Sequence, residues 1–166
     1  MVARRVDDPR LKEASPRDKG DLGEILETMR GRISEALGPD GVAEQQYTMG
    51  VAYGRFGRYD DAKVALAASA SGSARYRFPA AALLGRIYRD EGSTEEAVEW
   101  FERAAEVTAP TPDEGWTLLY HLGTTLDARE EWTRALAVFL ELRGTAGVYR
   151  DVEERVARLT TTLLGG

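Results

Sequence analysis

The sequence predicts an all-α solenoid, a row of antiparallel helix pairs, and three observations lead to this prediction. Apolar residues recur with the period of an α-helix from residue 21 to about residue 162. Three stretches repeat the same small and large side chains at the same offsets. The chain has 166 residues, a length that suits one domain with a sizeable core. We therefore expect a single domain over residues 21–166.

The first twenty residues differ from the rest of the chain. They are polar and charged, contain Pro9 and Pro16, and offer few side chains for a core. Segments of this composition cannot bury enough apolar surface to offset the entropy of ordering. Residues 1–20 are therefore predicted to be a disordered N-terminal arm.

A first helix is predicted over residues 21–38. Asp21 is placed to cap its N-terminus, and the Gly38-Pro39 pair ends it. One face repeats with i, i+3, i+4 and i+7 spacing and carries Leu22, Ile25, Leu26, Met29, Ile33 and Leu37.

The chain then repeats itself three times. The stretches are MGVAYGRFGRYDDAKVAL (49–66), LGRIYRDEGSTEEAVEWF (84–101) and LGTTLDAREEWTRALAVF (122–139). Each has Gly second, an alanine twelve residues later, and Leu or Phe four residues after that. The small residues are expected where the two helices of a pair cross, and the larger ones in the layer between pairs. The expected pairs span residues 43–77, 78–115 and 116–147.

The turn inside each pair can also be predicted. Gly57 and Gly92 lie there, where a positive φ is useful, and Glu130 holds this position in the third pair, so its turn is expected to differ. Ser93 with Glu96 has the spacing of a capping box. The last segment, 148–164, is expected to be a capping helix with Val152, Val156 and Leu159 inward and charges outward.

The repeated pattern resembles the tetratricopeptide repeat family. The likeness covers about residues 43–142 and is complete in the second repeat, with Leu84, Gly85, Tyr88, Ala97, Phe101 and Ala104. A looser likeness connects the opening DLGEIL segment and the terminal YRDVEERVARL segment to tetratricopeptide adaptors of bacterial polarity and motility. The resemblance implies a scaffold that binds other proteins.

Composition excludes several other classes of function. The net charge of −6 argues against a nucleic-acid surface, which needs clustered cations. No apolar run is long enough for membrane insertion, and no signal peptide is recognisable, so a cytoplasmic location is expected.

Catalysis is not expected either. The chain has no cysteine, one histidine and no phosphate-binding loop, so we predict no catalytic residues, no metal site and no cofactor. The single histidine, His121, is interpreted as a partly buried helix residue, with a role in a binding groove as the alternative.

The family resemblance implies a concave groove lined by the first helix of each pair. Three arginines and two tyrosines in this set could hold an acidic or carboxylate-bearing segment of a partner protein or peptide. The implied groove residues are Tyr47, Val51 and Arg55, then Ala82, Arg86 and Arg89, then Tyr120, Thr124 and Asp127. The alternatives left open are a solvated helix face and an architectural protein that associates with itself as a homo-oligomer.

Overall fold

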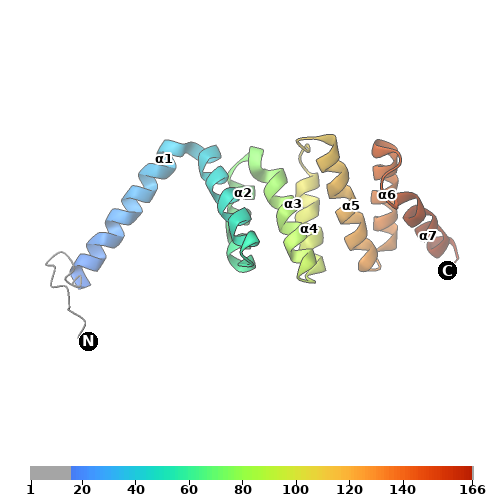
Figure 1. Ribbon diagram of the computed structural model, residues 1–166, viewed down its shortest axis with the longest axis horizontal. Coiled ribbons are helices and arrows are strands. Elements are labelled where there is room, and N and C mark those ends of the chain that lie inside the picture. The colour runs from blue at the N-terminus through green and yellow to red at the C-terminus, as the bar shows by residue number, and fades with distance from the viewer. Residues whose placement is uncertain (1–15, 166) are drawn as a thin grey trace, which may run out of the picture. The chain divides into compact units, whose positions relative to one another are not determined.

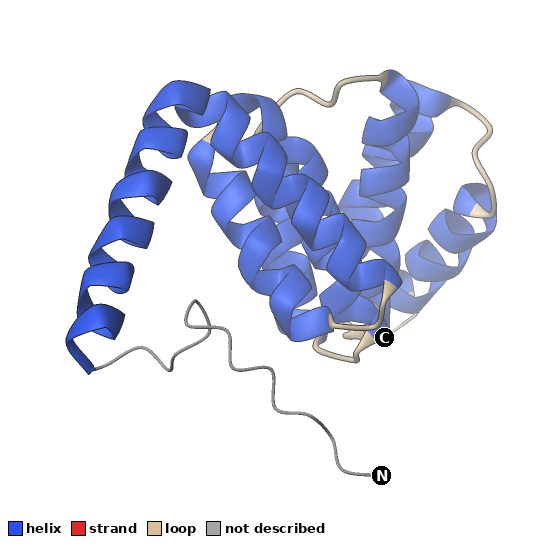
Figure 2. Cartoon of the chain, turned by 60° about the vertical axis from the view of Figure 1, so that its left-hand side comes forward, coloured by secondary structure: helices blue, strands red, loops and turns tan. Residues whose placement is uncertain are grey.

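The computed structural model describes residues 16–165, apart from the side chains of residues 16–23 and 26. This part of the chain is helical and contains no strand (Figures 1 and 2). The all-α prediction is therefore confirmed. The helices are α1 (Pro16–Arg55), α2 (Tyr59–Gly72), α3 (Ala74–Asp90), α4 (Thr94–Ala105), α5 (Pro112–Ala128), α6 (Trp132–Ala146) and α7 (Val152–Leu164).

Helix α1 belongs to two compact units, Met1–Gly38 and Pro39–Gly166. The break falls at Gly38, whose φ of 66° and ψ of 178° are not helical. A glycine reaches this conformation without a steric penalty, and the kink falls where the sequence placed the end of the first helix. The predicted start is wrong, because the helix begins at Pro16 and Asp21 lies inside it rather than at its cap. The rest of the predicted arm, residues 1–15, lies outside the described residues.

The second unit is a row of helices. Each of α2 to α6 packs against the next helix along the chain, ending with α7 on α6 (Figure 1). Neighbours in sequence are thus neighbours in space, as in a solenoid. The centre of the row is one continuous apolar cluster to which α2 through α7 all contribute.

The repeated glycines make room for the large side chain sixteen residues later. A Cβ atom on Gly85 would lie 2.5 Å from Cδ1 of Phe101, and one on Gly123 would lie 2.8 Å from Cε1 of Phe139. A Cβ atom on Gly50 would likewise lie 2.5 Å from Cγ of Leu66. The helices of a pair therefore cross over this contact. Leu66, Phe101 and Phe139 were expected in the layer between pairs. Each of them packs instead against the glycine of its own pair.

All three turns inside the pairs have the same geometry. The backbone N–H of Arg58 donates to the carbonyl of Tyr53 at 2.9 Å, and Ser93 and Glu131 make the equivalent bonds. The residue before each donor has a positive φ: 72° at Gly57, 87° at Gly92 and 61° at Glu130. The prediction that the third turn differs is therefore wrong, because the hydrogen bond imposes the left-handed conformation even on a glutamate.

The predicted capping box at Ser93 and Glu96 does not form, and a threonine caps another helix instead. Ser93 stands at the N-cap of α4 but makes no side-chain capping bond, so the Ser93–Glu96 prediction is wrong. Its ψ of 72° belongs to the turn rather than to the extended backbone usual at an N-cap. Thr111 has that extended backbone, and its Oγ1 accepts from the Glu114 N–H at 3.3 Å and donates to Glu114 Oε2 at 2.8 Å.

The connection between the first two pairs is shorter than expected. Only Ser73 separates α2 from α3, so α3 begins at Ala74 rather than at residue 78. Ser73 donates to the Asp40 carboxylate and accepts from the N–H of Arg75, while buried Ser69 donates to the carbonyl of Ala43 at 2.8 Å. These bonds fasten the end of α2 to residues 39–55 of α1.

Candidate binding groove

A pocket of about 200 Å³ lies between α3 and α5, and Tyr47 of α1 also lines it. Its walls are mostly apolar, with four polar or charged side chains among them. This is the composition of a surface that binds a ligand and fixes its orientation. The lining residues are Tyr47, Phe78, Pro79, Ala82, Leu83, Arg86, Phe101, Glu114, Thr117, Leu118 and His121.

Three of the predicted groove residues meet in this pocket: Tyr47, Ala82 and Arg86. Arg86 is exposed and makes no salt bridge within the described residues. Tyr47 is half-buried, and its ring lies 5.7 Å from that of Tyr76. Burial, helped by the negative charge of Glu114, raises the pKa of Tyr47. The pocket thus offers a neutral phenol beside a free guanidinium.

Arg89 lies nearby but is occupied. Its guanidinium forms a salt bridge to Asp90 at 2.7 Å, and its Nη1 donates to Nδ1 of His121 at 2.6 Å. Because a guanidinium has only donors, Nδ1 accepts and the ring proton of neutral His121 lies on Nε2. Arg89 therefore orients His121 rather than presenting a free charge to a ligand.

His121 remains neutral well below its usual titration range. Burial, together with the positive charges of Arg89, Arg86 and Arg150, lowers its pKa to about 4, against the opposing effect of Asp90. The ring also stacks on Phe101, with centroids 6.0 Å apart. The histidine is therefore a partly buried helix residue, as the first interpretation predicted, and it also lines the pocket.

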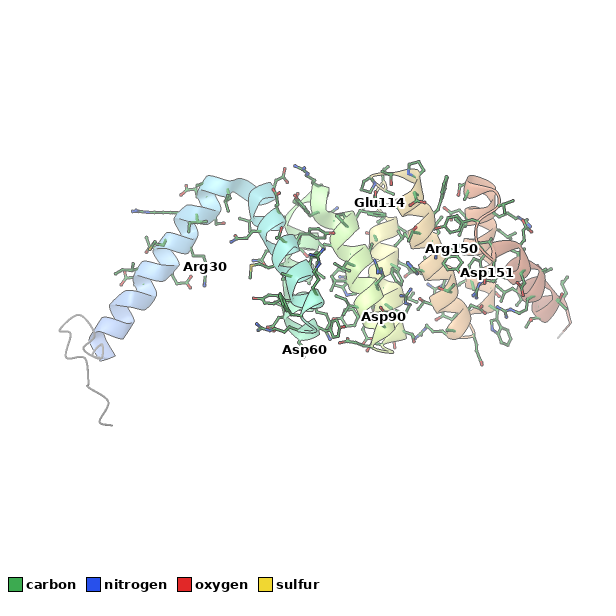
Figure 3. The ribbon with its side chains drawn as sticks, in the orientation of Figure 1. Arg30, Asp60, Asp90, Glu114, Arg150 and Asp151 are labelled. Atoms are coloured by element: carbon green, nitrogen blue, oxygen red, sulfur yellow. The ribbon has the colours of Figure 1, made fainter. Side chains whose placement is uncertain are left out.

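Glu114 gives the pocket a second charge of opposite sign. It lies in the first turn of α5, where the helix dipole favours a carboxylate (Figure 3). One carboxylate oxygen accepts from Thr111. The pocket therefore has an anionic side at Glu114 and a cationic side at Arg86.

The three predicted residues of α5 do not line this pocket. The Tyr120 hydroxyl donates to Asp151 at 2.8 Å, and Asp127 accepts from Arg155 at 3.1 Å and from Arg158 (Figure 3 labels Asp151). Tyr120 and Asp127 therefore face α7 and the residue just before it rather than α3. Thr124 is partly buried beside them and donates to the carbonyl of His121.

Arg55 is separate from the other two arginines. It lines a different hollow with Tyr47, Thr48, Val51, Ala52 and Phe56, all on the last turns of α1 and the turn that follows. The reason is that Arg55 stands one residue later in its repeat than Arg89 does in the next repeat. Counted from the repeated glycine, Arg55 matches Asp90, and Gly54 matches Arg89 and Asp127. The three arginines therefore do not converge.

Of the pocket residues on α5, sequence reasoning considered only His121, as the alternative interpretation of that residue, and missed the other three. Glu114, Thr117, Leu118 and His121 have i, i+3, i+4 and i+7 spacing, so they share one helix face. That spacing was visible in the sequence. Which face of α5 meets α3 depends on the packing of the pair, and only the structure shows it.

These observations define an all-α helical-repeat protein with a pocket on the first helices of its pairs. Residues 78–110 match the family model described as Tetratricopeptide repeat, which confirms the resemblance over most of α3 and all of α4. Repeats of this family are protein–protein interaction modules and are typically non-catalytic. No curated protein matches the chain.

Two further features of the described residues bear on other functions. These residues contain no group of three or more His, Cys, Asp or Glu side chains placed to hold a metal ion. No helix within them is both long enough and apolar enough to cross a membrane.

Proposed function

We propose that the chain is a non-catalytic adaptor that binds an acidic or carboxylate-bearing segment of another protein in the pocket between α3 and α5. The observation that carries this proposal is Arg86, an exposed cation beside Tyr47 and next to an apolar wall. A guanidinium can hold a carboxylate through two parallel hydrogen bonds. Tyr47 and His121 add flat contact surfaces that lose little entropy on binding.

The two charges of the pocket suggest an orientation for the bound segment. A carboxylate would lie at Arg86, and a hydrogen-bond donor, such as a backbone N–H, would lie at Glu114. Since Arg89 is held by Asp90 and His121, Arg86 supplies most of the attraction. A cytoplasmic location and a role in a bacterial motility or polarity assembly remain predictions from the sequence.

A random peptide library tests this function without a purified partner. The full chain is used to select from random peptides with free C-termini, and the selected peptides are expected to be rich in Asp, Glu or a terminal carboxylate. Arg86→Glu should abolish the selection.

Arg77→Glu is the matched control. Arg77 is an exposed arginine of the same helix, but it lines another hollow, with Trp100 and Arg103. Selection of basic or uncharged peptides, or equal loss of binding in both variants, would reject the proposed pocket.

A further inference from the structure

The connection between α6 and α7, residues 147–151, contains an exposed arginine that the proposed function does not use. This residue, Arg150, has a φ of 44°, in the left-handed region that glycine prefers. A strained residue persists only where its surroundings hold it, and such residues gather at functional sites. Arg150 is therefore held in a defined conformation at a cost to the backbone.

Two aromatic rings lie against the side chain of Arg150. Its Cζ atom is 4.5 Å from the centroid of the Tyr120 ring and 5.2 Å from that of Tyr149. The centroids of the two rings are 6.0 Å apart. An arginine beside an aromatic ring keeps the N–H donors at the edge of its guanidinium for a carboxylate. The two rings therefore fix the position of the charge and leave it open to a ligand.

The charge of Arg150 is not neutralised within the part of the chain that the structure describes, where it makes no salt bridge. The adjacent carboxylate, Asp151, is already occupied (Figure 3 labels both residues). Its Oδ1 accepts from the Tyr120 hydroxyl at 2.8 Å, and its Oδ2 accepts from Nε of Arg155 at 2.9 Å. Arg150 is thus available to an acidic group of another molecule.

Two contacts connect this arginine to the pocket between α3 and α5. Oγ1 of Thr117, a residue of the pocket wall, lies 3.1 Å from the hydroxyl oxygen of Tyr149. The ring of His121, in the same wall, lies 6.2 Å from that of Tyr120, centroid to centroid. Both rings beside Arg150 therefore border side chains that line the pocket.

We propose that Arg150 is a second anchor for the bound segment, which carries two carboxylates, one held by Arg86 and the other by Arg150. This inference rests on the proposed function, because it extends the same bound segment from α3 past α5 to the residues before α7. The positive charges of both arginines lower the pKa of His121, so their fields overlap at that ring. The neutral imidazole between the arginines favours uncharged residues between the two acids.

Repeating the peptide selection with Arg150→Gln tests the second anchor. The unmodified chain should select peptides with acidic residues at two positions a fixed distance apart, and Arg150→Gln should select only one of the two. A single acidic position in both selections would overturn the second anchor and leave the proposed role of Arg86 intact. No acidic preference in either selection would overturn the second anchor and the proposed function together.

A double-mutant cycle assigns the second carboxylate to Arg150. A selected peptide is compared with the same peptide carrying an amide at the acidic position that Arg150→Gln no longer selects, by calorimetric titration into both proteins. The amide and Arg150→Gln should each weaken binding about fivefold, and the two together should also weaken it about fivefold, because they remove the same contact. Losses that multiply to about 25-fold would show independent contacts and overturn the proposal.

Two further variants separate this contact from effects of charge or folding. Arg103→Gln is the matched control, since Arg103 is also exposed and its Cζ lies 4.5 Å from a ring centroid of Trp100, but it lines another hollow. That change should leave the affinity for the selected peptide unaltered. Arg150→Gly removes the side chain without backbone strain and should weaken binding as much as Arg150→Gln does. Full affinity in both Arg150 variants, or an equal loss in Arg103→Gln, overturns the proposal.

Discussion

Single side chains decide how closely the helices of a pair approach. In each pair a glycine faces a leucine or phenylalanine, and the missing Cβ provides the space that the larger side chain occupies. The neighbouring alanines Ala62, Ala97 and Ala135 are fully buried, so they allow the same close approach from the second helix. These small residues, rather than the large ones, fix the spacing of the repeat.

Gly85→Ala should therefore destabilise the chain by about 1–3 kcal/mol, because the new Cβ would overlap the Phe101 ring. Gly54→Ala is the control. It lies in a helix where a Cβ would meet nothing within 4 Å, and it should stabilise by about 0.5–1 kcal/mol. Urea unfolding of both variants measures the difference, and equal midpoints would show that the glycine–phenylalanine contact does not limit the packing.

His121 should make stability depend on pH. Its pKa is about 4 in the folded chain and 6.5 as the ordinary value, so between these values the unfolded state binds the extra proton. The contribution of His121 to stability should be constant above about pH 6.5 and fall as the pH drops toward 4, by roughly 1–2 kcal/mol at pH 5.

Urea unfolding at pH 7.5 and pH 5.0 measures this loss, with His121→Gln as the control. The variant should lose less stability over the same interval, since glutamine does not titrate. The same loss in both proteins would assign the pH dependence to other groups.

At the scale of elements, the structure builds all three pairs with one turn. The 6→1 hydrogen bond that ends α1, α3 and α5 requires a residue with positive φ, and the third pair meets this requirement with Glu130. Any residue other than glycine is strained there, so the third turn carries a conformational strain that the first two do not.

Glu130→Gly should remove this strain and stabilise the chain by about 1 kcal/mol. Glu106→Gly is the matched control, since Glu106 also ends a helix but has a φ of −67°. That change should be neutral or destabilising. Thermal unfolding of the two variants decides, and a destabilised Glu130→Gly variant would show that the glutamate side chain matters more than its backbone strain.

The elements themselves could be predicted well from sequence, because each depends on local signals: the apolar period, the small residues at fixed offsets and the turn glycines. Two predictions about turns and caps were wrong because the residue type did not reveal the backbone conformation at that position. Ser93 has the right residue type for a cap but a turn conformation, and Glu130 adopts the conformation of a glycine. In both cases the geometry of the whole turn overrides the preference of the residue.

For the whole molecule, the candidate site was only partly predictable. The repeat offsets located Tyr47, Ala82 and Arg86, which line the pocket, because α1 and α3 are each followed by another first helix. The same offsets failed on α5, where Tyr120 and Asp127 contact α7 or the segment just before it instead of bordering the pocket. A one-residue shift also moved Arg55 to another hollow. The end of a repeat array thus changes the environment of residues that match in sequence.

Arg86 is expected to be the main source of attraction in the pocket, with Glu114 as an opposing charge. Removing the negative charge with Glu114→Gln should strengthen binding of an acidic peptide by a few-fold. Higher salt should weaken the complex of the unmodified chain, because part of the attraction is screened.

The proposed binding at Arg86 is tested most directly by calorimetric titration of a selected acidic peptide into the unmodified chain and into Arg86→Glu and Arg77→Glu. We expect at least tenfold weaker binding for Arg86→Glu, equal to about 1.4 kcal/mol, with an unchanged melting temperature and nearly unchanged affinity for Arg77→Glu. Unchanged affinity in Arg86→Glu, together with loss of binding when exposed residues of α7 such as Glu154 or Arg158 are changed, would contradict this proposal and place the partner at the C-terminal end of the row.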